Sequence, residues 1–294
     1  MRSNRNRGLL FAITALAAIG LQTARAETAL KLFQPFGRLL NISARARVGT
    51  GDNVLIAGFT IVGSDVKKVA VRAIGPSLGK AGVTEPLRDT VLELHDGSGA
   101  IVAVNDDWKE TQREEIEQAQ LAPTDDREAA LIRTLAPGAY SAIVRGSEDA
   151  TGVAVVEVYD LDGASRSVLA NLSARAFSSA DSPIIGGVIV SDEGVPFNRV
   201  VVRAIGPTLQ AFGIQRTLDD PMLELRDADG TLVQQNDDWQ ESDRRDTLND
   251  RGLAPQDERE AAVVATLGPG AYSAVVRGSD DTAGAALVEF YQLR

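Results

Sequence analysis

Cysteine is absent from the 294 residues, and histidine occurs only once. Without cysteine there is no disulfide, no thiolate metal site and no cysteine nucleophile. Basic residues number 30 against 41 acidic ones, which gives a formal net charge of −11. Because binding to phosphates requires clustered lysine and arginine, neither nucleic acid nor an anionic membrane surface is an expected partner. The small share of aromatic residues, 5% of the chain, also argues against a broad surface for stacking sugars.

Long apolar runs are scarce, and the clearest lies at the N-terminus. Leu9 to Leu21 is preceded by three arginines and followed by the small-residue pattern Ala24-Arg25-Ala26. These three parts predict a secretory signal peptide at residues 1–26, cleaved after Ala26. A membrane anchor is the alternative, but the run is shorter than the roughly 20 residues that cross a bilayer. We therefore expect an exported protein, extracellular or periplasmic, with no transmembrane anchor in the mature chain.

What the chain does contain is an internal duplication. Residues 121–160 align without a gap with residues 253–292, and 26 of the 40 positions are identical. The match extends upstream at an offset of about 131 residues, from Arg72-Ala73-Ile74-Gly75-Pro76 to Arg203-Ala204-Ile205-Gly206-Pro207. That offset is too long for a solenoid repeat and fits a whole domain. A function shared by both repeats should use residues present at both equivalent positions.

Each repeat has the pattern of an all-β domain. Short runs of Val, Ile, Leu and Ala alternate with turn clusters such as Asp96-Gly97-Ser98-Gly99, which predicts about eight strands per repeat. A helical turn is expected only within residues 111–120, and the matching stretch at 241–252 is as readily a loop. We predict two tandem antiparallel β-sandwich domains of jelly-roll-like type after the signal peptide. They follow an N-terminal segment at 27–37 and cover residues 38–160 and 168–294, with a linker at 161–167.

Charged residues in the middle of strands are expected to be structural. Arg72 and Arg203 lie in strands that are apolar on both faces and therefore require buried partners. The repeat-matched candidates are the mid-strand glutamates, namely Glu93, Glu224, Glu157 and Glu289. The linker is so short that it spans at most about 25 Å when extended, so contact between the two domains is also expected.

Catalysis is not expected from these residues, and we predict that the protein is not an enzyme. The single histidine, His95, is replaced by Arg226 in the second repeat, and is interpreted as an exposed residue at a strand end. No repeat-matched serine, histidine and acid can be assembled into a triad. A hydrolase that uses carboxylates is the least favoured alternative, with Asp107 and Asp238 as the residues to test.

Acidic loops are the better candidates for a site. Hard oxygen ligands cluster in matched loops, and calcium takes six to eight oxygens; the candidate metal ligands are Asn105, Asp106, Asp107, Asn236, Asp237 and Asp238. Further acids follow downstream, including Glu128 and Glu260. The alternative is that these residues only form turns. Each loop is followed by a tryptophan, Trp108 or Trp239, which is a candidate for sugar stacking or, more often in such matched positions, a core residue.

The order of motifs resembles a known family. From Val91 to Asp160, and again from Met222 to Gln292, the sequence runs L-E-L-x-D, N-D-D-W, P-G-A-Y-S-A, V-R-G and V-E-x-Y. This order is similar to the bacterial pre-peptidase C-terminal domain. The resemblance implies a small β-sandwich that serves as an accessory or binding module of secreted proteins. No peptidase precedes the repeats, so the role of appendage to an enzyme in the same chain is not carried over. The full unit is similar to repeats of uncharacterised exported bacterial proteins.

Together these observations predict a non-catalytic exported bacterial module for interaction or structure. Its two repeats would present acidic loops to a protein or cell-surface partner, with calcium as a candidate stabiliser. The main alternative is a calcium-dependent carbohydrate-binding protein, in which a glycan would lie against Trp108 and Trp239.

Overall fold

The fold is almost entirely β-structure in this computed structural model, which describes residues 39–191 and 197–293. The predicted signal peptide and the segment 27–37 lie outside the described residues. The first repeat contains β1 (Leu39–Val48), β2 (Leu55–Val62), β3 (Lys67–Ile74), β4 (Thr90–Asp96), β5 (Ile101–Asn105), β6 (Ala129–Leu135), β7 (Gly138–Gly146) and β8 (Gly152–Asp160). The second contains β9 (Val168–Ser178), β10 (Ile184–Val190), β11 (Asn198–Ile205), β12 (Pro221–Asp227), β13 (Leu232–Asn236), β14 (Ala261–Leu267), β15 (Gly270–Gly278) and β16 (Gly284–Gln292).

Each repeat forms two half-sheets that pack face to face. In the first repeat, β6-β3-β8-β1 packs on β2-β7-β4-β5; in the second, β14-β11-β16-β9 packs on β10-β15-β12-β13. Every pairing between these strands is antiparallel (for example β1 with β8 and β2 with β7). The predicted all-β sandwich class is therefore confirmed.

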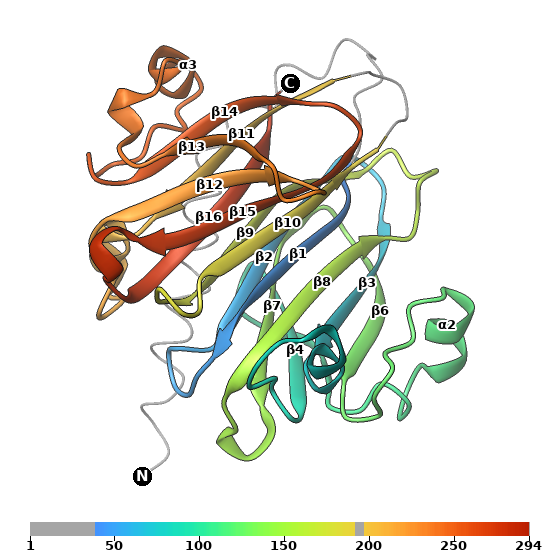
Figure 1. The fold of residues 1–294 in the computed structure, drawn as a ribbon. Helices are drawn as coiled ribbons and strands as arrows, with labels where there is room; N and C mark the ends of the chain where they lie inside the picture. Colours follow the sequence, from blue (N-terminus) through green and yellow to red (C-terminus); the bar gives the residue numbers. More distant parts are fainter. Residues whose placement is uncertain (1–38, 192–196, 294) are drawn as a thin grey trace.

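The two repeats are joined through their edge strands. β1 pairs with β10, and β2 pairs with β9, so both sheets continue across the boundary between the repeats (Figure 1). The two junctions are equivalent: Ser43 lies opposite Gly187 in one, and Ser173 lies opposite Gly58 in the other. A Cβ atom on Gly187 would lie 2.6 Å from the Oγ of Ser43, so a larger residue there would require the Ser43 hydroxyl to move. We call these two strand pairs the seam.

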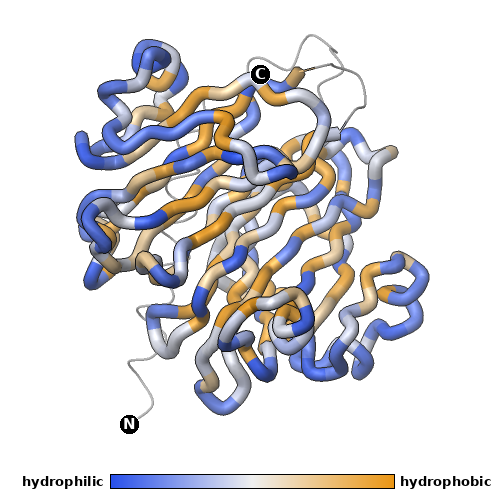
Figure 2. Tube along the Cα trace, in the orientation of Figure 1, coloured by the Kyte–Doolittle hydropathy of each residue, from blue (hydrophilic) through white to orange (hydrophobic). Residues whose placement is uncertain are grey.

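One hydrophobic core runs through both repeats. Alternate residues of the strands point inward, as Ile42, Ala44 and Ala46 do on β1, and none of the three is more than 1% exposed. The inward residues of both repeats belong to a single buried cluster. Hydrophobic segments follow the strands, whereas hydrophilic segments gather in the loops and around α2 and α3, the two short helices of the described residues (Figure 2). The predicted boundary at 161–167 falls between β8 and β9, yet both sheets and the core extend across it.

Helical structure in residues 39–191 and 197–293 is limited to short segments. α2 (Arg113–Gln118) forms where a helical turn is expected, and its Ile116 is buried. α3 (Arg245–Asp250) forms at the matching place, because Leu248 is buried there in the same way. In the part of the chain that the structure describes, no helix has the length and apolar character needed to cross a membrane.

The segment between the repeats is fixed by a buried lysine. Lys67 Nζ donates to both carboxylate oxygens of Asp160, at 2.8 and 2.7 Å, and to the Asp162 carbonyl at 2.8 Å. These three acceptors match the three donors of the ammonium group. The second repeat has a neutral pair at the equivalent place, where Gln292 donates to Asn198 at 2.7 Å. The same position in the fold therefore accepts either an ion pair or an amide pair.

Candidate functional site

The loop asparagines of the predicted calcium sites are engaged within the protein. Asn105 donates from Nδ2 to the Asp107 carbonyl at 2.9 Å and accepts from the Ala130 amide at 2.8 Å. Asn236 makes the two equivalent bonds at 2.8 and 2.7 Å. Each side chain thus closes its own loop and binds the strand of the facing sheet. Neither is placed as a metal ligand.

The aspartates of the first acidic loop face a third acid, Asp89, from the segment before β4. One oxygen of Asp89, Oδ1, is buried without a hydrogen-bond partner. Burial and the nearby charges of Asp106 and Asp107 raise the pKa of Asp89. Burial and the charge of Asp107 likewise raise the pKa of Asp106. The loop therefore concentrates negative charge, which the guanidinium of Arg127 offsets only in part.

The second acidic loop has the same arrangement. Asp220 has a buried Oδ1 without a hydrogen-bond partner, and its pKa is raised by burial and by Asp237 and Asp238. One difference is that Ser279 Oγ donates to Asp237 at 3.0 Å. Nowhere in residues 39–191 and 197–293 do three or more His, Cys, Asp or Glu residues form a group that could hold a metal ion. The loops gather acids, but not as a preformed metal centre.

The downstream glutamates have a structural role. Glu128 is fully buried and accepts from the amides of Gly75 and Ser77, at 3.1 and 2.9 Å. The Ser77 hydroxyl donates to the same oxygen at 2.6 Å. Glu260 holds the matching turn of the second repeat, and burial raises its pKa. These carboxylates therefore fix the Gly-Pro turn that follows β3 or β11. Their repetition at matched positions is the sequence signal that could have indicated this role.

The tryptophans belong to the interior. Trp108 is only 4% exposed and packs in a cluster with Ile116 and Ala130. Its Nε1 donates to the Asp125 carbonyl at 3.2 Å. Trp239 is half-buried and makes the equivalent bond at 3.1 Å. A sugar-stacking platform needs an exposed ring face, so the sugar interpretation of Trp108 does not hold in this structure.

Arg72 and Arg203 pair with the glutamates of the adjacent strand. Arg72 Nε donates to Glu157 at 2.9 Å, and Arg203 Nε donates to Glu289 at the same distance. In each repeat a tyrosine hydroxyl donates to the glutamate as well; for Tyr159 the distance is 2.9 Å. Burial and the charge of Glu157 raise the pKa of Tyr159 to about 12. These are structural networks.

His95 is not an exposed strand-end residue, because only 4% of it is exposed. Its Nε2 lies 2.9 Å from a carboxylate oxygen of Glu93, and its Nδ1 lies 3.1 Å from the Gly99 carbonyl. Both partners are acceptors, and hydrogen bonding to Glu93 raises the pKa of His95, which favours the protonated ring. Both ring nitrogens are thus engaged by these partners rather than by Ser141, which lies opposite on β7.

Glu93 has a matched counterpart in Glu224. Arg145 pairs with Glu93 at 2.6 Å, beside His95. Glu224 pairs with Arg226 at 2.6 Å and with Arg277. His95 and Arg226 thus occupy the same cationic position, which explains why the sequence tolerates the exchange between repeats. The mid-strand glutamates therefore have two roles. Glu157 and Glu289 pair with Arg72 and Arg203, whereas Glu93 and Glu224 form their ion pairs among the described residues with other cations.

Two sheet edges carry exposed aliphatic side chains. β5 and β13 each pair on one side only among the strands of the described ranges. On β5, Ile101 is 60% exposed and Val104 51% exposed, and on β13, Leu232 and Val233 are each 44% exposed. Edge strands in soluble proteins are usually protected by charge or proline. These two strands have neither. β5 is apolar over four of its five residues, whereas β13 is apolar only at Leu232 and Val233 and continues with two glutamines.

The neighbouring edge strand β6 is covered by side chains. The Asn105 side chain accepts from the Ala130 amide, and Gln112 both accepts from the Ile132 amide and donates to its carbonyl, each at 3.0 Å. These bonds occupy backbone groups that another strand would otherwise use. β5 and β6 are edge strands of the same sandwich, so one edge of the first repeat is open and the other is covered.

Comparison with known proteins adds little. No family model matches the chain, and no curated protein matches it. The solved pre-peptidase C-terminal domain of collagenase from Bacillus anthracis is similar at 14% identity, over 44% of this chain and 98% of that domain, with a TM-score of 0.27. The isomalto-dextranase of Arthrobacter globiformis T6, complexed with panose, is 13% identical over 84% of this chain and 36% of the enzyme, with a TM-score of 0.20. At such TM-scores neither likeness supports an argument about function.

Proposed function

We propose that the chain is a non-catalytic interaction module, exported by a bacterium, that binds an extended segment of a partner protein along β5 and β13. The observation that carries the proposal is the pair of matched apolar edges, of which β5 presents Ile101 and Val104. An extended segment that adds to a sheet edge gains backbone hydrogen bonds, and its alternate side chains supply specificity.

The surroundings of the edges indicate the chemistry of the partner. The loop after β5 carries Asp106 and Asp107, and α2 adds Glu114, whereas the other two glutamates of α2 are paired with Lys68 and Arg113. The loop after β13 is acidic as well, with Asp237 and Asp238. Electrostatic complementarity favours a partner segment with aliphatic residues flanked by lysine or arginine. Two such edges in one chain allow bivalent binding, which strengthens a weak contact when both edges engage one target.

The absence of catalysis is part of the proposal. Ser141 lies opposite His95, but this pair is unsuitable for nucleophilic catalysis because the ring nitrogens of His95 already face two acceptors. The buried glutamates that could act as acids or bases are engaged by backbone amides or arginine. A broad panel of hydrolase substrates, with Asp107→Asn and Asp238→Asn as comparisons, tests this part. Turnover that is lost in either variant would contradict it.

The binding test compares three forms of the chain as bait. The first is wild type, the second carries Val104→Lys and Val233→Lys, and the third carries Val66→Lys as the matched control. Val66 is 55% exposed and lies between β2 and β3, so it receives the same change at similar exposure away from both edges. Proteins captured from bacterial envelope and medium are quantified on each bait, and the complex is mapped by amide hydrogen exchange.

We expect one partner to bind wild type and the Val66→Lys control and to be lost from the edge variant. Hydrogen exchange in the complex should slow at β5 and β13, because their free amides become hydrogen-bonded. Equal capture by all three baits, or protection that leaves both edges unchanged, would refute edge binding.

Calcium stabilisation is a second candidate, and one observation favours it. Asp89 and Asp220 each keep a buried oxygen without a hydrogen bond beside a pair of aspartates. Since no group of three acids among the described residues could hold a metal ion, calcium would have to take backbone and water oxygens as well. Calorimetric titration with calcium chloride tests this candidate. Saturable binding near two ions per chain with a raised Tm would support it, and the absence of heat would remove it.

A further inference from the structure

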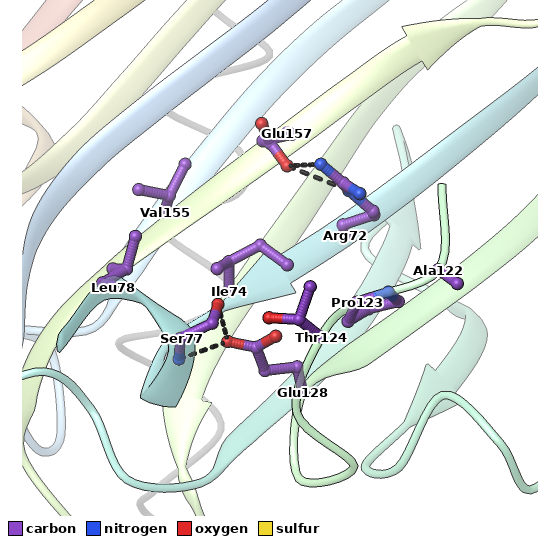
Figure 3. A pocket seen from close by; sticks show the side chains of 10 residues that line it. All are labelled: Arg72, Ile74, Ser77, Leu78, Ala122, Pro123, Thr124, Glu128, Val155 and Glu157. Atoms are coloured by element: carbon purple, nitrogen blue, oxygen red, sulfur yellow. Dashed lines mark hydrogen bonds and ion pairs between the residues drawn. The ribbon is translucent and has the colours of Figure 1, made fainter. Parts of the chain in front are cut away.

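An open hollow of about 220 Å³ lies on the outer face of the first repeat, beside β3 and β8 (Figure 3). Its walls combine aliphatic carbon with a charged pair and a hydroxyl; they include Ile74, Leu78, Val155, Arg72, Glu157 and Thr124. In the close view, the aliphatic side chains lie on one side of the hollow, with the ion pair above and Thr124 across from them (Figure 3).

The equivalent place in the second repeat is closed. Ile205, Leu209 and Leu287, the counterparts of the aliphatic wall, are each at most 3% exposed. They pack in a buried cluster that also includes Ile214 and residues of the first repeat. The ion pair is also more exposed in the first repeat. The side chains of Arg72 and Glu157 are 17% and 18% exposed, against 8% and 2% for those of Arg203 and Glu289.

Side-chain size differs between the two places in the same direction. Val155 stands where the second repeat has Leu287, and Val83 stands where it has Ile214. In the turn after β3, Gly79 and Ala81 replace Gln210 and Phe212; all four exchanges make the first repeat smaller. The fold itself therefore does not require the hollow, because the same backbone arrangement is filled when larger residues are present.

We propose that this hollow binds a branched aliphatic side chain together with its peptide amide, as a leucine residue of a partner protein would present them. The second repeat indicates the aliphatic part, since Ile214 and, from the first repeat, Ile56 and Ile143 pack there against the counterparts of the aliphatic wall. At the rim, the exposed hydroxyl of Thr124 can bond the amide, whereas Arg72 and Glu157 already bond each other and border the site as a charged pair. An anchor side chain in such a pocket commonly dominates the energy of an interface.

This site is independent of the edge strands. It lies on the face formed by β3 and β8, whereas the edge proposal concerns β5 and β13. Either proposal can fail while the other holds, because the edge variants do not alter any residue that lines the hollow.

The test uses the full-length chain and N-acetyl-leucinamide as the probe, with N-acetyl-glycinamide as the control ligand. Binding is followed by amide chemical shifts in NMR spectra. We expect saturable shifts centred on Ser77, Leu78 and Thr124, with a Kd of about 1 mM because the ligand is so small. The glycine compound lacks the aliphatic group and should cause no saturable shift.

Three variants locate the site. Val155→Leu places the residue of the second repeat in the hollow and should weaken binding by about tenfold or more. Val66→Leu makes the same substitution at an exposed position that lies on neither edge strand and does not line the hollow, and should leave the affinity unchanged. If Val155→Leu does not fold, Thr124→Val, on an exposed loop, removes the rim hydroxyl and should also weaken binding.

The proposal is overturned if the probe produces no saturable shifts at these amides. Equal shifts with the glycine compound, or unchanged affinity in the folded Val155→Leu or Thr124→Val protein, would overturn it as well.

Discussion

Removing the charge of Asp160 is expected to destabilise the protein strongly. In the wild type, the side chain of Lys67 is 0% exposed and that of Asp160 is 3% exposed. Asp160→Asn takes away the counter-charge of an ammonium group that water does not reach. Breaking a buried ion pair in this way costs about 3–5 kcal/mol, because one charge stays buried and unpaired.

The second repeat indicates how to recover the loss. Asn198 and Gln292 hold the same position with one hydrogen bond of 2.7 Å and no charge. The double variant Lys67→Asn, Asp160→Gln copies that pair into the first repeat. Since a buried ion pair is often replaced by neutral groups at little cost, we expect the double variant to lie within about 1 kcal/mol of wild type.

Urea denaturation provides the measurement, with the fluorescence of Trp108 and Trp239 as the signal. In a chain of this size, each kcal/mol lost from the free energy of unfolding lowers Tm by about 2–4 °C. The loss in Asp160→Asn therefore corresponds to a Tm lower by about 6–20 °C. The double variant should unfold close to wild type. The reasoning is refuted if Asp160→Asn costs less than about 1 kcal/mol, or if the double variant is as unstable as the single one.

Three further predictions follow from single sites. Hydrogen bonding to a carboxylate raises the pKa of His95, so its stabilising contribution is complete below pH about 6.5 and is lost as pH rises through the folded pKa. His95→Arg, which copies Arg226, should keep that stability at both pH 6 and pH 9 in urea titrations. A variant with the same pH dependence as wild type would contradict this. Because burial raises the pKa of Asp89, its charged form costs stability as pH rises above about 4. Asp89→Asn should therefore raise the free energy of unfolding at pH 7 by about 0.2–1 kcal/mol. A lower Tm in this variant would show that the carboxylate is needed. A Cβ on Gly75 would lie 2.4 Å from a backbone carbonyl oxygen, whereas one on Gly79 would lie 3.5 Å from its nearest contact. Gly75→Ala should therefore lower the free energy of unfolding by about 1–3 kcal/mol, and Gly79→Ala should lower it little, as measured by differential scanning calorimetry. Equal losses in the two variants would rule out the close approach as the cause.

The fold class follows from the sequence because its signals are local and occur twice. Alternation of apolar residues and the Asp-Gly turns predict strands without reference to distant contacts. The pairing of Arg72 with a mid-strand glutamate also follows from pattern, because two charges in apolar strands need each other. Choosing Glu157 rather than Glu93 requires the strand order, since β3 lies beside β8 and not beside β4.

The acidic loops show where sequence reasoning reaches its limit. Asn105 and Asp106 look equally suited to bind a cation, yet only tertiary contacts reveal that Asn105 is occupied by the Ala130 amide. Asp89 joins the acids from a separate segment, and no motif marks it. Burial of His95 was missed for a similar reason, because its surroundings come from β7 and the turn after β4.

The seam between the repeats has an evolutionary consequence. Its two strand pairs are equivalent, so each repeat offers the other the same two edges that it receives. Two identical copies of a single repeat could form this junction as a symmetric dimer, because such an interface needs only one self-complementary surface. Gene duplication then converts a concentration-dependent assembly into a permanent one and frees the halves to diverge. The filled cluster of the second repeat and the open hollow of the first are the kind of divergence that such a fusion permits.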